Sequence, residues 1–387
     1  MHAGSNAEKA NPLRRLTALG QSVWFDYIRR DLYEGPNLKR LIEEDGLRGM
    51  TSNPAIFQKA IAETQLYDDD IRQLAAKGAG VSTIVESLAV EDVSRAADVF
   101  RPVHEATGGD DGFVSIEVRP QLSADTEGTV AEARRLWKEC NRPNVMVKIP
   151  ATGAGIPAIE QCISEGININ ITLLFSVSRY REVMEAFLDA MEERVAAGQP
   201  VDHVHSVASF FVSRVDSNVD KKLDAVALDA TRSDRERQLA RKLRGKAAIA
   251  NARIAYEAFE KTFQGPRWER LRQEGVRLQR PLWASTSTKD PSYPDLYYVE
   301  ALVAANSVNT MPPKTFDAYR DHGDPKIRIH DDLLDADSTF RSLAELGIDG
   351  PRISQELEEE GAQKFSESIA QISRAVEQKE KSINAIR

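Results

Sequence analysis

The sequence predicts an α/β fold, a (β/α)8 TIM barrel formed as a single domain. Eight short apolar segments with strand character recur along the chain, and amphipathic helical patterns separate them. Strands that alternate with helices pair in parallel through right-handed crossovers, and eight such units close a barrel. An open, doubly wound sheet is the structural alternative. The predicted strands are residues 22–26, 49–53, 113–118, 145–150, 168–174, 204–212, 281–286 and 308–312.

The helical pattern is clearest after the fifth predicted strand, where apolar residues recur every three or four positions. One apolar face on such a helix suits packing against the outside of a barrel. The residues with this spacing are Tyr180, Val183, Met184, Phe187, Leu188, Met191 and Val195.

Three regions exceed a minimal barrel, and we expect each to add helices. Residues 1–11 are interpreted as a flexible lead-in to a first helix. The span 215–280, before the seventh strand, is rich in Arg, Lys, Glu and Ala and predicts extended helices with a break at Gly265-Pro266. The tail, residues 330–387, is charged and helical. Its apolar positions predict that it packs on the barrel: Phe340, Leu343, Leu346, Phe365, Ile369 and Ile372.

The composition indicates a cytoplasmic globular protein, a monomer or a homodimer. A net charge of -9 and a pI near 5.4 argue against a nucleic-acid partner or an anionic membrane. No apolar run approaches the length of a membrane span, and residues 1–11 lack the apolar core of a signal peptide. Cys140 and Cys162 cannot build a disulfide framework, so we interpret both as core residues in a reducing compartment.

Lys148 is the most informative residue, because it lies in the apolar run Val145-Met146-Val147-Lys148-Ile149-Pro150. Burial disfavours the ammonium form of a lysine, and a neutral amine attacks carbonyls to form Schiff bases. The alternative is a strand-end lysine whose ammonium group reaches solvent.

The other strand ends favour the reactive interpretation. Catalytic side chains of a barrel lie at the C-terminal strand ends, and alternate residues of a strand share a face. Seven predicted strands deliver polar groups there, which packing explains poorly. The groups are Asp26; Thr51 and Asn53; Ser115 and Glu117; Lys148; Asn168, Asn170 and Thr172; Ser209, followed by Phe211 and Arg214; and Ser285 and Ser287, followed by Thr288 and Lys289.

These residues are suited to Schiff-base chemistry on a ketone that carries hydroxyl groups and a phosphate. Dehydration of the adduct and cleavage of a carbon–carbon bond need acid/base groups, and Asp26 and Glu117 are the available carboxylates. Amides and hydroxyls can bind substrate hydroxyls, whereas cations can bind a phosphate. The hydroxyl-binding candidates are Asn53, Asn170 and Ser209, and the phosphate-binding candidates are Arg214, Ser285, Ser287 and Lys289.

Six segments, in the same order along the chain, resemble transaldolase. The resemblance runs from about residue 12 to 320 and is closest to the longer bacterial subfamily. The segments are Met50-Thr51-Ser52-Asn53-Pro54-Ala55-Ile56-Phe57, Val114-Ser115-Ile116-Glu117-Val118, Val147-Lys148-Ile149-Pro150, Ile169-Asn170-Ile171-Thr172-Leu173-Leu174-Phe175-Ser176, Ser209-Phe210-Phe211-Val212-Ser213-Arg214 and Trp283-Ala284-Ser285-Thr286.

The resemblance implies a class I aldolase-type barrel that works without a metal or other cofactor. It implies that Lys148 forms the Schiff base and that Asp26 handles the carbon–carbon bond. The implied reaction moves a dihydroxyacetone unit from sedoheptulose 7-phosphate to glyceraldehyde 3-phosphate. The products are erythrose 4-phosphate and fructose 6-phosphate, in the pentose phosphate pathway.

The resemblance also implies roles for the remaining site residues. Glu117 and Thr172 would hold a water for dehydration of the carbinolamine, and Phe211 would shape the pocket. Thr51, Asn53, Asn170 and Ser209 would contact the substrate, with Arg214 and Ser285 at its phosphate. Shorter family members carry Ser-x-Arg on the seventh strand, where this chain has Ser285-Thr286-Ser287, so Lys289 is the candidate for the second phosphate cation.

Several alternatives remain open at the level of sequence. A simple class I aldolase would use the same lysine. A metal-dependent barrel hydrolase would use His203 and His205, interpreted as two imidazoles on one strand face. A barrel retained only as a binding module would form no adduct. The G-x-G-x-x-A pattern of residues 153–158 is weak evidence for a nucleotide site, because the next strand does not end in the Asp or Glu expected at the ribose.

Overall fold

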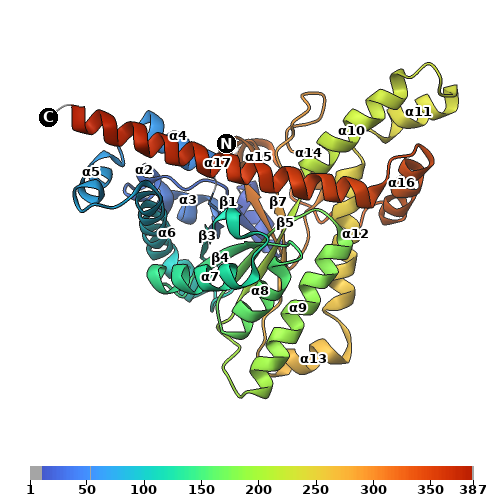
Figure 1. The fold of residues 1–387 in the computed structure, drawn as a ribbon. Helices are drawn as coiled ribbons and strands as arrows, with labels where there is room; N and C mark the ends of the chain where they lie inside the picture. Colours follow the sequence, from blue (N-terminus) through green and yellow to red (C-terminus); the bar gives the residue numbers. More distant parts are fainter. Residues whose placement is uncertain (1–10, 53, 386–387) are drawn as a thin grey trace, which may run out of the picture.

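The computed structural model describes residues 11–52 and 54–385, and its strands form a closed barrel (Figure 1). All neighbouring strands are parallel, in chain order, and β8 pairs with β1. The barrel prediction is therefore confirmed and the open-sheet alternative is wrong. The strands are β1 (Gln21–Phe25), β2 (Gly49–Met50), β3 (Phe113–Glu117), β4 (Val145–Pro150), β5 (Ile169–Leu174), β6 (Ser206–Phe211), β7 (Arg280–Ala284) and β8 (Ser307–Met311).

Helices connect the strands and surround the barrel. The first is α1 (Pro12–Ala18), capped by the Asn11 side chain, which accepts a 3.0 Å hydrogen bond from the Leu13 amide. The rest of the predicted lead-in, residues 1–10, lies outside the described residues. The other helices up to β6 are α2 (Arg30–Tyr33), α3 (Asn37–Asp45), α4 (Pro54–Glu63), α5 (Asp68–Ala76), α6 (Val81–Ala106), α7 (Thr126–Cys140), α8 (Gly155–Ser164) and α9 (Val177–Ala196).

Several predicted strands are longer than the observed ones, and the differences at β2 and β6 bear on candidate residues. β2 ends at Met50; the Thr51 amide still donates to the Phe25 carbonyl at 3.0 Å, but the chain then turns into α4 at Pro54. Proline suits the first turn of a helix, which explains why the strand stops early. β6 begins at Ser206 rather than at residue 204.

The barrel interior has an apolar layer at its base and polar side chains above it. Alternate strand residues point inward, so a step of two residues along a strand leads from one layer to the next. Trp24, Phe113, Met146, Val207, Leu282 and Val308 belong to one buried cluster. Gly49 makes room for it, because a Cβ atom at this position would lie 2.6 Å from the Trp24 ring. The polar layer lies two residues further along the same strands and contains Asp26, Ser115, Lys148, Ser209 and Thr310.

The region before β7 forms four helices, and α10 projects with α11 away from the barrel (Figure 1). The predicted break is confirmed, since α13 begins at Gly265 with Pro266 in its first turn. Two further breaks were not predicted. One of them lies just before α11, where a capping box of Ser233 and Glu236, an S-x-x-E pattern, starts a new helix. The helices are α10 (Ser213–Leu228), α11 (Asp234–Leu243), α12 (Ala247–Thr262) and α13 (Gly265–Gln273).

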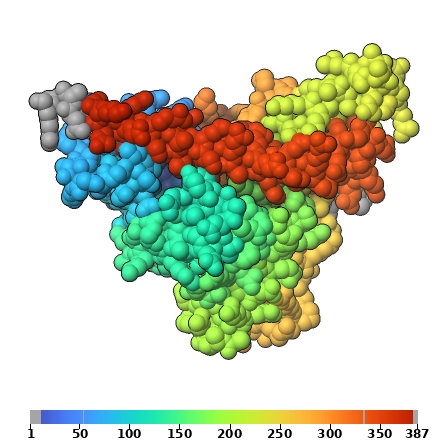
Figure 2. Space-filling model, viewed as in Figure 1, coloured from blue at the N-terminus to red at the C-terminus, as the bar shows by residue number. Residues whose placement is uncertain are grey.

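The C-terminal tail is helical and packs on the rest of the molecule. After α14 (Tyr297–Ala301) and α15 (Pro313–His322) come α16 (Leu333–Glu345) and the 36-residue α17 (Gly350–Ala385). Figure 2 shows α17 as a continuous ridge across the upper face of the molecule. Its far half buries Ile372 and Val376 in a cluster with Ile61, Tyr67 and Leu88 of the segment between β2 and β3. No described helix is both long enough and apolar enough to cross a membrane.

Candidate active site

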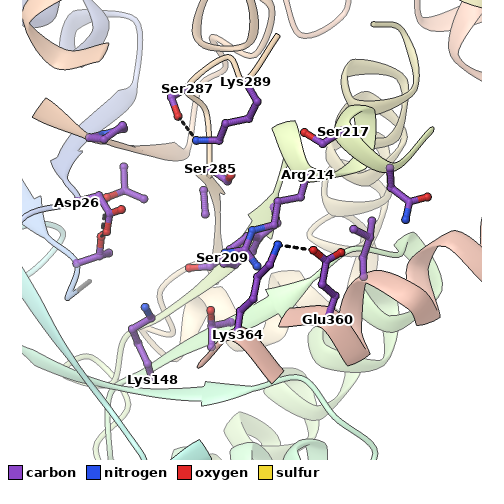
Figure 3. A pocket seen from close by; sticks show the side chains of 18 of the residues that line it. Asp26, Lys148, Ser209, Arg214, Ser217, Ser285, Ser287, Lys289, Glu360 and Lys364 are labelled. Atoms are coloured by element: carbon purple, nitrogen blue, oxygen red, sulfur yellow. Dashed lines mark hydrogen bonds and ion pairs between the residues drawn. The ribbon is translucent and has the colours of Figure 1, made fainter. Parts of the chain in front are cut away.

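A cavity of about 500 Å³ opens at the C-terminal ends of the strands (Figure 3). This volume is typical of a small-molecule site, and the place is where barrel enzymes carry their chemistry. Of the predicted site residues, the ones that line it are Asp26, Thr51, Lys148, Thr172, Ser209, Phe211, Arg214, Ser285, Ser287 and Lys289.

Lys148 lies on β4 at the inner end of the cavity and is only 8% exposed. It is the register partner of Glu117, the last residue of β3, and its Nζ donates a hydrogen bond to Glu117 Oε1. Side chains directly opposite on neighbouring strands stand side by side, so the barrel register itself creates this ion pair. Glu117 is therefore placed to accept the proton that Lys148 must lose before its amine can attack a carbonyl.

Asp26 lies at the end of β1, on another part of the cavity wall from Lys148 (Figure 3). Its backbone amide donates to the Met311 carbonyl at 2.8 Å, and its Oδ1 accepts a 2.8 Å hydrogen bond from Thr51 Oγ1. Thr51 also lies 2.8 Å from the hydroxyl of Thr310 on β8. Hydroxyl and backbone contacts thus fix the orientation of this carboxyl group at the cavity surface.

Thr172 lines the cavity beside an irregularity of β5. The pairing of β5 with β6 shifts register between Ile171 and Leu174, and Leu173 has φ +60°, in the left-handed region. Such bulges redirect side chains and occur often beside active sites. Thr172 lies two residues after Asn170 and so shares its inward face, whereas the bulge turns Leu173 toward α17.

A buried chain of hydrogen bonds underlies the cavity. Asn170 Nδ2 donates to Ser115 Oγ at 3.0 Å, and Asn170 Oδ1 accepts from Ser209 Oγ at 2.7 Å. Asn170 is fully buried and does not line the cavity, whereas Ser209 does. In this arrangement Asn170 orients Ser209 from below. Asn53, the other amide predicted to contact substrate, lies outside the described residues.

Cations gather at the end of the cavity away from Lys148. Arg214, in the first turn of α10, stacks over the Phe211 ring at 4.9 Å. Burial lowers the pKa of its guanidinium, although the Glu360 and Asp26 carboxylates partly offset this. Desolvation by its surroundings also lowers the pKa of Lys289, and the Arg214 charge lowers it further. Two cations that destabilise each other form a site where a bound anion would be favourable.

Hydroxyl groups border these cations. Ser287 accepts a 2.7 Å hydrogen bond from Lys289 Nζ, and the Ser285 and Ser213 hydroxyls lie 3.0 Å apart. Ser285 has φ +55°, an uncommon conformation for a residue other than glycine, and it follows directly after β7. The turn after β7 thereby brings Ser285, Ser287 and Lys289 beside Arg214, which supports the prediction of a phosphate pocket.

Six polar residues that line the cavity escaped the sequence prediction. Thr310 lies near the end of β8, where inward-facing residues alternate as they do on the other strands, so the sequence contained the pattern that predicts it. Ser217, Asn218 and Lys221 follow Arg214 at helical spacing, which places them on one face of α10. Glu360 and Lys364 come from α17, and only the tertiary packing of the tail reveals them. All six border the cavity together with Ala284, Pro312 and Leu357.

The predicted histidine pair is wrong as a strand-borne metal site. His203 and His205 precede β6, and His203 is exposed beside Asp202, at 3.5 Å. His205 is buried near the rings of Phe113 and His104, where burial, more than the His104 charge, lowers its pKa to about 3. Within residues 11–52 and 54–385, no group of three or more His, Cys, Asp or Glu side chains is arranged to hold a metal ion.

The G-x-G-x-x-A segment serves the local fold. The Thr152 hydroxyl donates to the Ser123 carbonyl and accepts from the Gly155 amide at 2.9 Å. A Cβ atom at Gly155 would lie 2.0 Å from the Pro150 carbonyl oxygen, so this glycine allows α8 to start directly above β4. The turn thus closes tightly over the end of the strand that carries Lys148.

The sequence comparisons agree with this geometry. The sequence model of the transaldolase/fructose-6-phosphate aldolase family matches residues 23–376. The chain belongs to this family. The match includes every predicted catalytic residue and extends through most of α17, beyond the range that the sequence motifs suggested.

Among curated relatives of this transaldolase-family chain, similarity extends over nearly the whole length. A protein named transaldolase from Acidothermus cellulolyticus is 48% identical over 369 residues, which cover 95% of this chain and 96% of the relative. Transaldolase from Frankia alni is 47% identical, with 94% and 96% of the two chains covered. Transaldolase from Mycobacterium bovis is 48% identical, with 92% and 94% covered.

Proposed function

We propose that this protein is a transaldolase, a transferase of the pentose phosphate pathway that acts in the cytoplasm. It transfers a dihydroxyacetone unit from sedoheptulose 7-phosphate to glyceraldehyde 3-phosphate, giving erythrose 4-phosphate and fructose 6-phosphate. The observation that carries the proposal is Lys148, buried in the cavity wall and paired with Glu117 behind it, in the same cavity as Arg214 and Lys289.

The first half-reaction begins at Lys148. Transfer of a proton to Glu117 frees the amine, which attacks the ketone carbon C2 of the donor sugar. The carbinolamine then loses water. Glu117, which has taken the proton of its partner Lys148, returns it to the departing hydroxyl, and Thr172 of the cavity wall holds that group. The resulting iminium ion withdraws electrons from the bond between C3 and C4.

Asp26 acts in the second step. As a base, it accepts the proton of the C4 hydroxyl, so that the C3–C4 bond breaks and an aldehyde leaves. The three-carbon unit stays on Lys148 as an enamine until the acceptor aldehyde arrives and the steps reverse. Ser209, oriented by Asn170, can hydrogen-bond the retained hydroxyls. Arg214, Ser285, Ser287 and Lys289 hold the phosphate end.

Transfer to an aldehyde, rather than simple aldol cleavage, requires that the enamine survive after the first product leaves. An enclosed site with few water molecules protects such an intermediate. α17 contributes Leu357, Glu360 and Lys364 to the wall of the cavity and so helps to enclose it, which supports the transferase over the simple aldolase.

Borohydride reduction tests this proposal. With fructose 6-phosphate present, reduction should leave a three-carbon adduct on Lys148, located by peptide mass mapping. Lys148→Ala should lose the adduct and turnover while it keeps a native far-UV circular dichroism spectrum. Lys138→Ala, which removes an exposed lysine of α7, is the matched control and should retain both. Adduct on another lysine, or no adduct in the wild-type protein, contradicts the mechanism.

A further inference from the structure

α17 brings charged side chains into the cavity from outside the barrel. Leu357, Glu360 and Lys364 all line it and follow the spacing of one helical face. Figure 3 shows Glu360 and Lys364 on the side of the cavity that also holds Arg214. The helix is therefore part of the site wall as well as an outer layer.

Gly361 explains how closely α17 approaches. A Cβ atom on this residue would lie 3.0 Å from Leu173 Cδ2 and 3.7 Å from Arg214 Nη1. Glycine inside a helix costs about 1 kcal/mol relative to alanine. Its position at the crossing point lets the helix backbone rest directly against the bulge of β5 and the arginine of α10.

Glu360 is an anion among cations. Its side chain accepts a hydrogen bond from Lys364, and this contact is the largest cause of its lowered pKa. The charges of Lys364, Arg214 and Lys221 lower the pKa further. All four residues line the same cavity. The carboxylate thus occupies the kind of electrostatic environment that a substrate phosphate requires.

We propose that Lys364 is a phosphate-binding residue of this site, and that Glu360 is an internal anion that the phosphate displaces from the surrounding cations. This inference rests on the proposed function, because the ligand is the phosphate of a sugar substrate. A phosphate dianion carries more charge than the carboxylate and can take over its contacts. A neutral sugar cannot do so, and therefore the exchange makes the pocket selective for phosphorylated substrates.

A purely structural role makes a different prediction. Glu360 and Lys364 are four residues apart on one helix, and their side chains are 48% and 55% exposed. If their pairing only supported α17, loss of either partner would have a small effect of the same sign. Competition with phosphate instead predicts opposite signs for the two residues.

The experiment compares binding of inorganic phosphate, by calorimetry, with steady-state kinetics on fructose 6-phosphate and fructose. Lys364→Met should weaken phosphate binding and raise KM for fructose 6-phosphate by about threefold to tenfold, as expected for one partly exposed charge contact. Lys364→Arg should restore most of the loss. Glu360→Gln should tighten phosphate binding and lower that KM. Changes with fructose should be much smaller.

Two further variants calibrate the result. Lys381→Met removes an exposed lysine from the same helix, about 25 Å along its axis at 1.5 Å per residue, and should leave phosphate binding unchanged. Arg214→Ala gives the effect of losing the arginine of the phosphate-binding end of the cavity. The inference is overturned if Lys364→Met behaves like Lys381→Met, or if Glu360→Gln fails to tighten phosphate binding.

Phosphate binding separates this inference from the proposed function, because it needs no turnover. Suppose that the wild-type protein forms no adduct on Lys148, but Lys364→Met weakens and Glu360→Gln tightens phosphate binding. This result contradicts the proposed reaction and upholds the phosphate site. Normal turnover without those changes contradicts only the inference about α17.

Discussion

At the scale of residues, the site separates two carboxyl groups by what they contact. Glu117 pairs directly with the Lys148 ammonium group. Asp26 is held by a backbone amide hydrogen bond and by the Thr51 hydroxyl, on a different strand. Carboxyl groups in different environments can serve different proton transfers, so the geometry supports separate roles in adduct formation and in bond cleavage.

This separation predicts distinct phenotypes for two conservative variants. Glu117→Gln should slow formation of the adduct by about 100-fold or more, as expected for loss of an acid/base group. Asp26→Asn should trap adduct from fructose 6-phosphate at close to the wild-type rate but release little glyceraldehyde 3-phosphate. Single-turnover trapping and a coupled assay of aldehyde release measure the two steps. If both variants trap adduct at the wild-type rate and both retain turnover, the assignment of separate roles is wrong.

At the scale of elements, the insertion before β7 holds α10 in place and with it Arg214. Asp216 of α10 accepts hydrogen bonds from the Ala248 amide at 2.8 Å and from the Tyr298 hydroxyl at 2.9 Å. Asp220, one turn later, accepts from the Gly245 amide and the Tyr293 hydroxyl. These contacts join α10 to α12 and to the segment after β7. α10 and that segment both contribute residues to the phosphate end of the cavity.

Asp216 should make stability depend on pH. Burial raises its pKa from 3.8 to about 7, so the native state keeps a proton that the unfolded state loses above about pH 4. Its contribution to stability therefore falls as pH rises from about 4 to 7 and is constant above that range. Asp216→Asn removes this dependence. As pH rises from 5 to 8, the free energy of unfolding of the variant should increase relative to that of the wild type, by on the order of 1–4 kcal/mol.

Urea denaturation at several pH values measures this difference. Asp337→Asn, an exposed aspartate of α16, is the control and should track the wild type. A difference between Asp216→Asn and the wild type that does not change with pH would mean that Asp216 stays ionised in the native state.

At the scale of the whole molecule, α17 links distant parts of the chain. It crosses from α16 and α10 to α4, α5 and α6, and Lys379 donates to the Thr64 carbonyl at 2.7 Å (Figure 1). The apolar cluster under its far half contains residues from two ends of the sequence, Ile61 and Val376 among them. Neither part can bury its apolar surface alone.

We therefore predict that the chain unfolds as one cooperative unit, as a single domain. The four tryptophans, Trp24, Trp137, Trp268 and Trp283, all precede the tail, whereas far-ultraviolet circular dichroism also reports α16 and α17. Thermal unfolding followed by tryptophan fluorescence and by circular dichroism should give coincident transitions. An earlier loss of helical signal, before the fluorescence changes, would show that the tail melts separately.

The sequence alone determined the order of strands and helices and favoured the barrel, because strand and helix periodicities are local properties of the chain; the pairing of β8 with β1 decided against an open sheet. The alternation of apolar and polar residues at strand ends also identified Lys148, Glu117 and Asp26, since the carboxyl ends of parallel strands converge at one end of a barrel. The motif resemblance then indicated the family, which the comparisons confirm.

Only the tertiary structure decided how these residues meet. The Lys148–Glu117 pair depends on strand register, and the approach of Leu173 to α17 depends on a bulge of β5 that strand propensity does not predict. Asn170 proved to lie beneath Ser209 rather than at the cavity surface. Glu360 and Lys364 reach the site because an interior glycine lets α17 cross the barrel mouth at close range. Contacts between residues more than a hundred positions apart depend on packing, which local sequence patterns do not encode.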